Sequence, residues 1–477
     1  MNINIGKQAF YHFLSQIGFS ISGFIATFAI ARILGAEGVG IYALGLSLLV
    51  FVNLPVSGIG DATVKRISEG REKGQYFSLG LLLNIIVAIF ASVIIVLFRD
   101  ILNSYTGGEI ALLVVGVAIC RSPFQTLKWT LQGEGKVAYS GWVRTIERTL
   151  RTALQVILLL LGYKIFGLFL GYMASLLLGA LMSVAVIEIK PKFPRRRHLE
   201  SLFSYAKYGW SNALKGTTFN WMDTIVLGVF VTPSFVGIYE VAWTLSTFLL
   251  MASNSLSSAL FPEISRLEKE GEIEKIKSNI NDALVFAGVL LIPGFFGAAI
   301  LGEEILSIYS AEFSKGQYVL LILISALTFN AYFSQLTSAM RGLDKPDVAL
   351  KIDFVFVGSN MILNVVLVYL FGWHGAAVAT LISSFISLAV GYYAISGLIG
   401  RPGIPRREIT KEVISGGTMF LVILFLNETF ESNIFVTVLL VIVGAVIYWT
   451  TLLTISVRIR RKVFGLLPET ISKIMPI

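Results

Sequence analysis

Apolar residues in this chain gather in blocks of about twenty, and this spacing limits the possible fold more than any other feature. Three clear examples lie at 77–98, 166–187 and 434–453. A helix rises about 1.5 Å per residue, so a block of this length crosses a hydrocarbon core of about 30 Å. Charged residues make up 14% of the 477 positions, whereas a soluble domain has about 25%. The sequence therefore predicts an all-α integral membrane protein.

About fourteen segments have the length and apolar character of transmembrane helices. They lie at 9–33, 38–60, 77–98, 109–131, 138–162, 165–188, 203–231, 234–261, 281–301, 317–340, 347–371, 374–398, 409–427 and 433–455. The first residues lack the basic start, short apolar run and small-residue cleavage site of a signal peptide. We expect them to lead into the first span.

Lysine and arginine are unevenly divided between the connectors, which predicts the orientation of the chain. They gather in alternate connectors, at 65–73, 136, 190–197, 266–277, 341–345 and 401–411, and in the tail at 458–473. The opposite connectors hold little beyond Arg99, Lys164 and Lys315. We therefore expect a multi-pass protein of the plasma (inner) membrane with both termini in the cytoplasm. The net charge of +9 then reflects topology, and we expect no nucleic-acid partner.

Short motifs recur at a nearly constant distance along the chain. The tetrapeptide Val-Gly-Ile-Tyr at 39–42 returns at 236–239, an offset of 197 that also aligns Ile67 with Ile264. At an offset of 209, Gly133 and Lys136 align with Gly342 and Lys345. Alternating-access transporters are commonly built from two related helix bundles. We therefore predict two pseudo-symmetric lobes of six helices each.

The predicted domains follow from this repeat. The N-terminal lobe covers 1–190, a basic cytoplasmic linker covers 191–202, and the C-terminal lobe covers 203–398. The remaining residues, 399–477, hold two further helices and a basic cytoplasmic tail.

The predicted helix at 138–162 carries the most charge inside the membrane. Arg144, Arg148 and Arg151 recur at i, i+4 and i+7, which places them on one helix face. Charged side chains at this depth normally face a partner or a water-filled cavity. Glu147 precedes Arg151 by four residues and is expected to neutralise part of the charge. The alternative is a helix lying partly along the cytoplasmic interface, with arginines that reach the lipid headgroups.

Other polar side chains fall inside predicted spans. Arg121 lies near the middle of its span and Lys215 lies in the seventh, so both are candidates to line a cationic cavity with the three arginines. Glu147, Asp223 and Asp353 are candidates for ion coupling or for pairing with a cation. Five polar side chains are further candidates to line the cavity: His12, Gln16, Asn212, Asn330 and Asn360. A single histidine or asparagine inside the membrane more often hydrogen-bonds a neighbouring helix than a ligand.

The intramembrane candidates are mainly cationic, which favours an anionic substrate. Arginine makes paired hydrogen bonds to phosphate oxygens, so a lipid linked to a saccharide through phosphate or pyrophosphate would fit. One cysteine, Cys120, cannot form a disulfide within the chain or a cysteine metal site. We expect no cofactor and no metal.

At two places the sequence resembles the polysaccharide flippase family, in the superfamily that also contains MATE drug exporters and lipid II flippases. The resemblance rests on Arg-Ile-Leu-Gly-Ala-Glu-Gly-Val-Gly-Ile-Tyr at 32–42 and on Trp-Met-Asp-Thr-Ile-Val-Leu-Gly at 221–228. It implies two lobes around a cavity that opens alternately to either side, with energy from a membrane potential or an ion gradient. The first span has no central arginine, unlike the peptidoglycan-precursor flippases, which argues against that subgroup.

We therefore expect a flippase that moves a lipid-linked oligosaccharide across the plasma membrane for surface polysaccharide or glycan assembly. We expect a monomer in contact with membrane lipids, with H⁺ or Na⁺ as a coupling ion. The alternative is a MATE-like cation-coupled drug exporter, which shares the fold but needs buried carboxylates for cationic compounds. A membrane enzyme would need clustered carboxylates, metal ligands or a large outer loop, none of which the sequence indicates.

Overall fold

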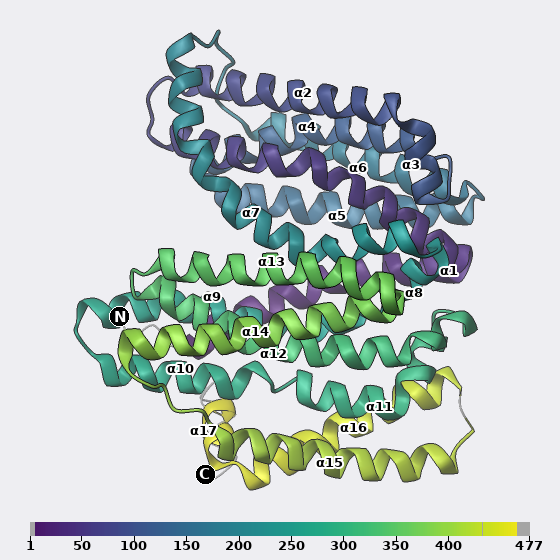
Figure 1. Ribbon diagram of the computed structural model, residues 1–477. Helices are drawn as coiled ribbons and strands as arrows, with labels where there is room; N and C mark the ends of the chain where they lie inside the picture. The colour runs from purple at the N-terminus through teal and green to yellow at the C-terminus, as the bar shows by residue number, and fades with distance from the viewer. Residues whose placement is uncertain (1–4, 432, 465–477) are drawn as a thin grey trace. The chain divides into compact units, whose positions relative to one another are not determined.

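The computed structural model describes the backbone of residues 5–431 and 433–464, and within them all side chains except those of 5–22, 207–213 and 464. Every regular element in this part of the chain is a helix (Figure 1). The helices form two compact units. The first unit is Ile21–Glu240, and the second begins at Val241 and includes the start of the first helix.

The first unit is built on a long N-terminal helix and the six helices that follow it. Its elements are α1 (Ile5–Ser68), α2 (Lys73–Leu97), α3 (Arg99–Thr106), α4 (Ala111–Gly133), α5 (Val137–Leu160), α6 (Lys164–Val186) and α7 (Arg196–Phe230). α4 packs against α2 on one side and α6 on the other, and α6 packs against α5 (Figure 1). α4 continues through Pro123 as one helix. α7 begins within the basic linker predicted at 191–202.

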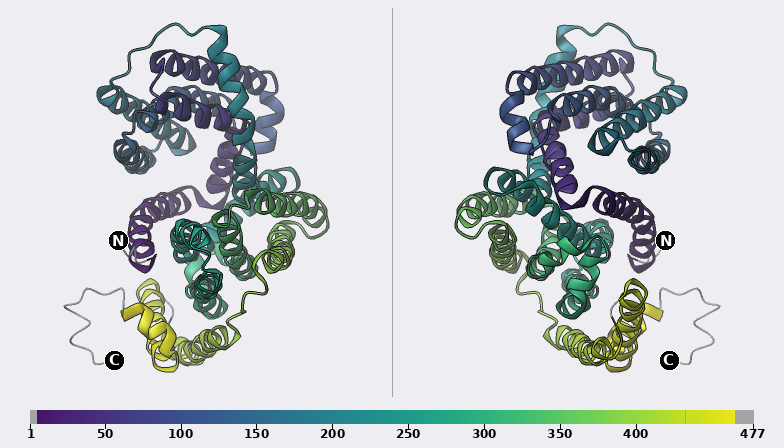
Figure 2. Two further views of the ribbon diagram at one scale, coloured as in Figure 1. Left: turned by 90° about the vertical axis from the view of Figure 1, so that its left-hand side faces the viewer. Right: turned by 90° about the vertical axis from the view of Figure 1, so that its right-hand side faces the viewer.

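The second unit is also wholly helical where it is described. It holds α8 (Pro233–Leu249), whose first turns belong to the first unit, then α9 (Met251–Lys269), α10 (Ile273–Ala287), α11 (Leu291–Ser307), the 3₁₀ helix η1 (Ala311–Gly316), α12 (Gln317–Gly342), α13 (Pro346–Phe371), α14 (Trp373–Ile399), α15 (Arg406–Thr429), α16 (Ile434–Ile455) and α17 (Val457–Phe464). α14 packs against α12 and α13, and α15 lies beside α16, as both views in Figure 2 show.

Most predicted spans coincide with single helices, but 234–261 is divided between α8 and α9, and 281–301 between α10 and α11. α1 covers the first two spans, and its one non-helical residue, Gly35 (φ 70°), lies between them. By length and composition alone, the described part contains ten helices suited to cross a membrane, or eleven if the bent pair α8 and α9 forms one span. α5 is not among them because its arginines interrupt the apolar run. The chain is therefore a multi-pass membrane protein, and fourteen spans stay a prediction.

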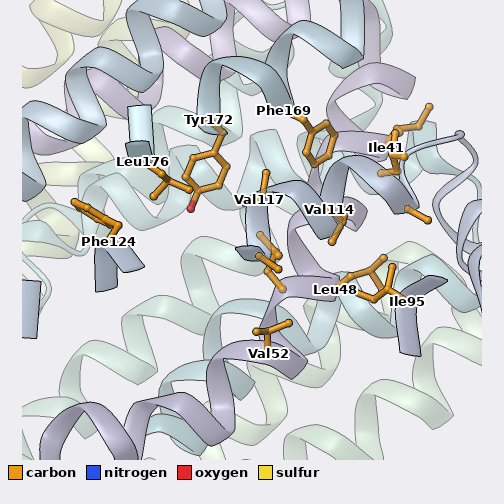
Figure 3. Close-up of a cluster of buried hydrophobic side chains, with 14 of the residues drawn as sticks. Ile41, Leu48, Val52, Ile95, Val114, Val117, Phe124, Phe169, Tyr172 and Leu176 are labelled. Atoms are coloured by element: carbon orange, nitrogen blue, oxygen red, sulfur yellow. The ribbon is translucent and has the colours of Figure 1, made fainter. Parts of the chain in front are cut away.

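Aliphatic and aromatic side chains fill the interior of the first unit. Leu48 and Val52 of α1 meet Val114 and Val117 of α4, with Phe169 of α6 closing the cluster (Figure 3). Residues of these types lie three and four positions apart, so they share the inner face of each helix. This packing fixes α4, α5 and α6 relative to one another within the unit.

The repeated sequence motifs make equivalent contacts in the two units. In the first unit, a Cβ atom on Gly133 would lie 2.6 Å from Cβ of Ile67, and in the second a Cβ on Gly342 would lie 2.9 Å from Cβ of Ile264. The residues two places after these glycines, Gly135 and Asp344, both have positive φ, 80° and 53°. The isoleucines aligned at an offset of 197 and the glycines aligned at an offset of 209 thus form the same contact in each unit. This agreement supports an internal structural repeat.

Candidate functional site

The candidate site is the charged face of α5 and the helices that border it. Arg144, Glu147, Arg148 and Arg151 follow one another at spacings of three or four residues, and α5 is a continuous helix over this stretch. Glu147 is buried, Arg148 and Arg151 are half-buried, and Arg144 is exposed. The three arginines therefore run from the surface of α5 into the packed part of the first unit.

Arg151 is held at the buried end of this face by two neighbours, Glu147 and Tyr172. Its Nε atom lies 3.7 Å from Oε1 of Glu147, which confirms the predicted intrahelical ion pair. Its guanidinium group stacks over the ring of Tyr172 at 4.4 Å, and a cation over an aromatic face is attracted to the ring quadrupole. Ser175 donates a hydrogen bond of 3.0 Å to the same oxygen of Glu147. α6 thus orients both members of the pair, and Tyr172 borders the apolar cluster (Figure 3).

Arg148 lies against a glycine of α1. A Cβ atom on Gly23 would be only 2.7 Å from Nη2 of Arg148, so the absence of a side chain there gives the guanidinium group its place. One turn further along α5, Gln155 donates hydrogen bonds to the hydroxyl of Tyr42 at 2.7 Å and to the carbonyl of Leu168 at 2.9 Å. α1 and α6 therefore fix the inner end of the arginine face.

α4 adds two more cations to this region. Lys128 is half-buried and lies near enough to Arg121 and Arg144 for their charges to act on it. Arg121 also lines a small hollow between α1, α2 and α4, together with the amides Asn53, Asn84 and Gln125. Arginine and amide side chains donate hydrogen bonds, so this lining suits an anionic or polyhydroxylated group.

A pair of carboxylates lies on α7 and on the first turns of α8, still within the first unit. Asp223 is buried and accepts a hydrogen bond from the hydroxyl of Tyr239. Glu240 accepts a hydrogen bond from Thr224, and its charge interacts with that of Asp223. Two acidic groups this close can share a single positive charge, as a proton or a small cation.

The remaining predicted site residues have ordinary structural surroundings. Asp353 is buried and pairs with Arg341, Nη2 to Oδ2 2.7 Å. Asn360 donates a hydrogen bond of 3.2 Å to the hydroxyl of Thr380, as expected for an intramembrane amide. Asn330 and Lys215 are both half-buried on their helices.

The structure brings only some of the predicted residues together. Arg121, Arg144, Glu147, Arg148 and Arg151 belong to one region of the first unit. Asp353, Asn330 and Asn360 belong to the second unit. The side chains of His12, Gln16 and Asn212 lie outside the described residues.

A sequence profile of the family described as polysaccharide biosynthesis protein matches residues 5–268, more than half of the chain. This chain belongs to that family. A second profile, described as lipid II flippase MurJ, matches residues 165–445. This match also covers more than half of the chain. Members of the family are membrane transporters of the flippase type and not enzymes.

Individual relatives agree with the family assignment. The protein named probable flippase AglR from Haloferax volcanii is 29% identical over 474 residues, which covers 98% of this chain and 99% of that protein. The lipid II flippase MurJ in an inward closed conformation matches with a TM-score of 0.76 at 16% identity, covering 92% of this chain and 97% of MurJ. An inward-facing multidrug resistance MATE family transporter gives 0.63 at 15% identity, covering 80% and 95%. At such low identity, the two structures show the fold alone.

Sequence reasoning missed part of this candidate site. Glu240 follows the second copy of the repeated tetrapeptide, where the first copy has Ala43, and that difference was the available signal. Tyr172 and Ser175 are common residue types in membrane helices, so nothing in the sequence set them apart. Only packing of α6 on α5 shows that they hold Arg151 and Glu147.

Proposed function

We propose that this protein flips an oligosaccharide linked to a lipid by phosphate or pyrophosphate across the plasma membrane, for assembly of surface polysaccharide or glycans. The arginine face of α5 carries the proposal. Between residues 144 and 151 this helix has three arginines and one glutamate, and Glu147 and Tyr172 hold the innermost arginine in position. A fixed guanidinium group can donate two parallel hydrogen bonds to phosphate oxygens.

The surroundings of this face fit the two parts of such a substrate. The hollow lined by Arg121, Asn53 and Gln125 offers hydrogen-bond donors of the kind that sugar hydroxyls accept. The outer surfaces of the helices are apolar, so a lipid tail could stay in the bilayer while the polar part crosses. The name of the relative from Haloferax volcanii, probable flippase, supports the same class of function.

The proposed mechanism is alternating access between two lobes of six helices, with helices α15 and α16 outside the repeat. We propose fourteen spans and both termini in the cytoplasm, because this arrangement places the basic connectors inside. A monomer suffices for this mechanism. The carboxylates Asp223 and Glu240 are candidates to bind the coupling ion, H⁺ or Na⁺.

A MATE-like drug exporter is the second candidate, and one observation favours it. The buried carboxylates Asp223 and Glu240 are the kind of group that a cationic drug or its coupling ion needs. The arginine face of α5 argues against it, because like charges would repel a cationic compound.

The test is complementation of a strain that lacks the gene. Loss of the gene should remove surface glycan and leave lipid-linked saccharide on the inner leaflet, and the intact chain should restore export. The double variant Arg148→Ala, Arg151→Ala should insert normally but fail to restore export. Arg196→Ala, at an exposed position of α7 that pairs only with Glu200 in the contacts described, is the matched control and should restore it. Unchanged glycan with raised drug sensitivity would instead support the exporter.

A further inference from the structure

The second unit contains a buried carboxylate that makes no hydrogen bond to any described residue. Glu412 of α15 has no exposed surface, and neither of its carboxylate oxygens has a hydrogen-bond partner among the described residues. The hydroxyl groups of Tyr332 and Tyr448 are also buried, and they too lack a partner in the part of the chain that the structure describes. Buried polar groups in proteins are normally satisfied, so four such oxygens in one region call for an explanation.

These oxygens belong to one small region. A Cβ atom placed on Gly288 would lie 2.6 Å from the hydroxyl of Tyr332 and 3.3 Å from Oε2 of Glu412, so both groups face the space that this glycine leaves open. The charge of Glu412 also acts on Tyr448, and Tyr448 interacts with Tyr332. α12 and α15 therefore direct oxygens toward the same point, and Tyr448 of α16 lies near enough for the charge of Glu412 to act on it.

The backbone at this point is a broken membrane helix. α10 ends at Ala287 and α11 begins at Leu291, inside a stretch that is long and apolar enough to span the membrane as one helix. The C-terminal end of a helix carries partial negative charge. Broken helices in transporters commonly present such ends and free carbonyl groups to bound cations.

The nearby cations are engaged with other carboxylates. Lys411 donates to Glu408 at 2.7 Å, while Arg458 and Lys462 bind Asp282 at 2.7 and 2.6 Å. Ser456 donates its hydrogen bond to Glu408 as well. Thus the basic groups of α15 and α17 neutralise Glu408 and Asp282, and none of the described contacts neutralises Glu412.

We propose that Glu412, Tyr332, Tyr448 and the end of α10 at Gly288 bind a monovalent metal cation of the sodium type. One carboxylate balances a single positive charge, so a divalent ion would leave net charge in the membrane interior. Carboxylate, hydroxyl and carbonyl oxygens are the ligands that hard cations prefer. A proton on Glu412 would leave the tyrosine hydroxyls unsatisfied, and a water molecule would leave the carboxylate charge uncompensated.

Sodium binding to the purified full-length protein tests this proposal without any measurement of transport, so its outcome is separate from that of the proposed function. Replacing choline chloride by NaCl at constant ionic strength should raise the melting temperature saturably, by about 3 °C at a hundredfold excess over the dissociation constant. The probes are Na⁺, Li⁺ and K⁺, with radioactive sodium as a direct measure of binding.

Four variants locate the site. Glu412→Gln should abolish the response, and Tyr448→Phe should weaken binding about tenfold through loss of one ligand. Gly288→Ala should also weaken it, because the methyl group enters the ligand space without changing charge. Glu428→Gln, an exposed position on the same helix, is the control and should respond as the wild type does.

Two outcomes would overturn the proposal. A wild-type protein that binds none of the three ions at either acidic or alkaline pH would show that Glu412 holds only a proton. Sodium binding of unchanged affinity in Gly288→Ala and Tyr448→Phe would place the ion elsewhere. Because these two variants keep the charge of Glu412, they decide the question even if Glu412→Gln does not fold.

Discussion

Gly40 and Gly237 pack backbone against backbone in the first unit. A Cβ atom on Gly40 would lie 1.8 Å from the carbonyl oxygen of Pro233 and 3.1 Å from the amide nitrogen of Gly237. A Cβ on Gly237 would lie 1.9 Å from the carbonyl oxygen of Ala36 and 2.9 Å from the amide nitrogen of Gly40. The two copies of the repeated tetrapeptide thus contact each other reciprocally, and each glycine makes room for the other copy's backbone.

This contact predicts that neither glycine tolerates a methyl group. Gly40→Ala or Gly237→Ala forces a backbone carbonyl aside, and overpacking of this kind should lower the free energy of unfolding by about 3 kcal/mol. Thermal unfolding of the purified protein measures the effect. Gly216→Ala, on α7 with no neighbour within 4 Å, is the control and should be neutral or slightly stabilising. Equal stability of all three variants would contradict the close packing.

Gly23 gives a second, milder prediction, about transport and not about folding. A methyl group there would lie 2.7 Å from Nη2 of Arg148, and the far end of a flexible side chain can move away. Gly23→Ala should therefore fold normally but displace the guanidinium group. We expect glycan export to fall about tenfold, equivalent to about 1.4 kcal/mol, measured as surface glycan in the complemented strain. Full export by Gly23→Ala would show that the position of Arg148 is unimportant.

The helical conformation of the apolar runs was predictable from the sequence, because the bilayer interior allows few backbone conformations. Runs of apolar residues must satisfy their backbone hydrogen bonds internally, so the runs became helical, although 234–261 and 281–301 are each divided between two helices. The pair Glu147 and Arg151 was predictable for the same reason, since their spacing of four residues follows from helix geometry alone. The break at Gly35 also fell between two predicted spans.

Contacts between helices distant in sequence could not be predicted. No periodic pattern joins Tyr172 to Arg151, or Arg341 to Asp353, because those pairs depend on how separate helices pack. Glu412 was overlooked because it follows a basic, solvent-facing start of a helix, where a glutamate ordinarily reaches water. Its burial arises only from α16 and the broken helix packed beside it.

Arg341 and Asp353 provide a prediction about stability. Asp353 is buried, so replacing either residue breaks the ion pair and removes the opposite charge from beside the residue that remains. Arg341→Ala and Asp353→Ala should each lower the free energy of unfolding by about 1–3 kcal/mol. The double variant should lose less than the sum of the two, because the second change removes the charge left by the first. Strict additivity in denaturant unfolding would mean that the pair contributes nothing.

The contact between Glu72, just before α2, and His198 of α7 predicts that stability depends on pH. His198 accepts the backbone N–H of Arg195 on Nδ1, so Nε2 carries the proton that it donates to Glu72 at 3.0 Å. Arg197 pairs with the other oxygen of this carboxylate. Burial acts to raise the pKa of Glu72, but the hydrogen bond from His198 and the charge of Arg197 together lower it.

The sign of this pKa change fixes the direction of the prediction. A carboxylate whose pKa is lowered by folding stabilises the fold above its ordinary value of 4.5, and this contribution disappears as the pH falls through the lowered value. Glu72→Gln should therefore be less stable than the wild type at neutral pH, and the difference should vanish in acid. Melting temperatures across the acidic range measure it, with Glu200→Gln, exposed and paired with Arg196, as the control. A difference that stays constant with pH would contradict the role of the Glu72 charge.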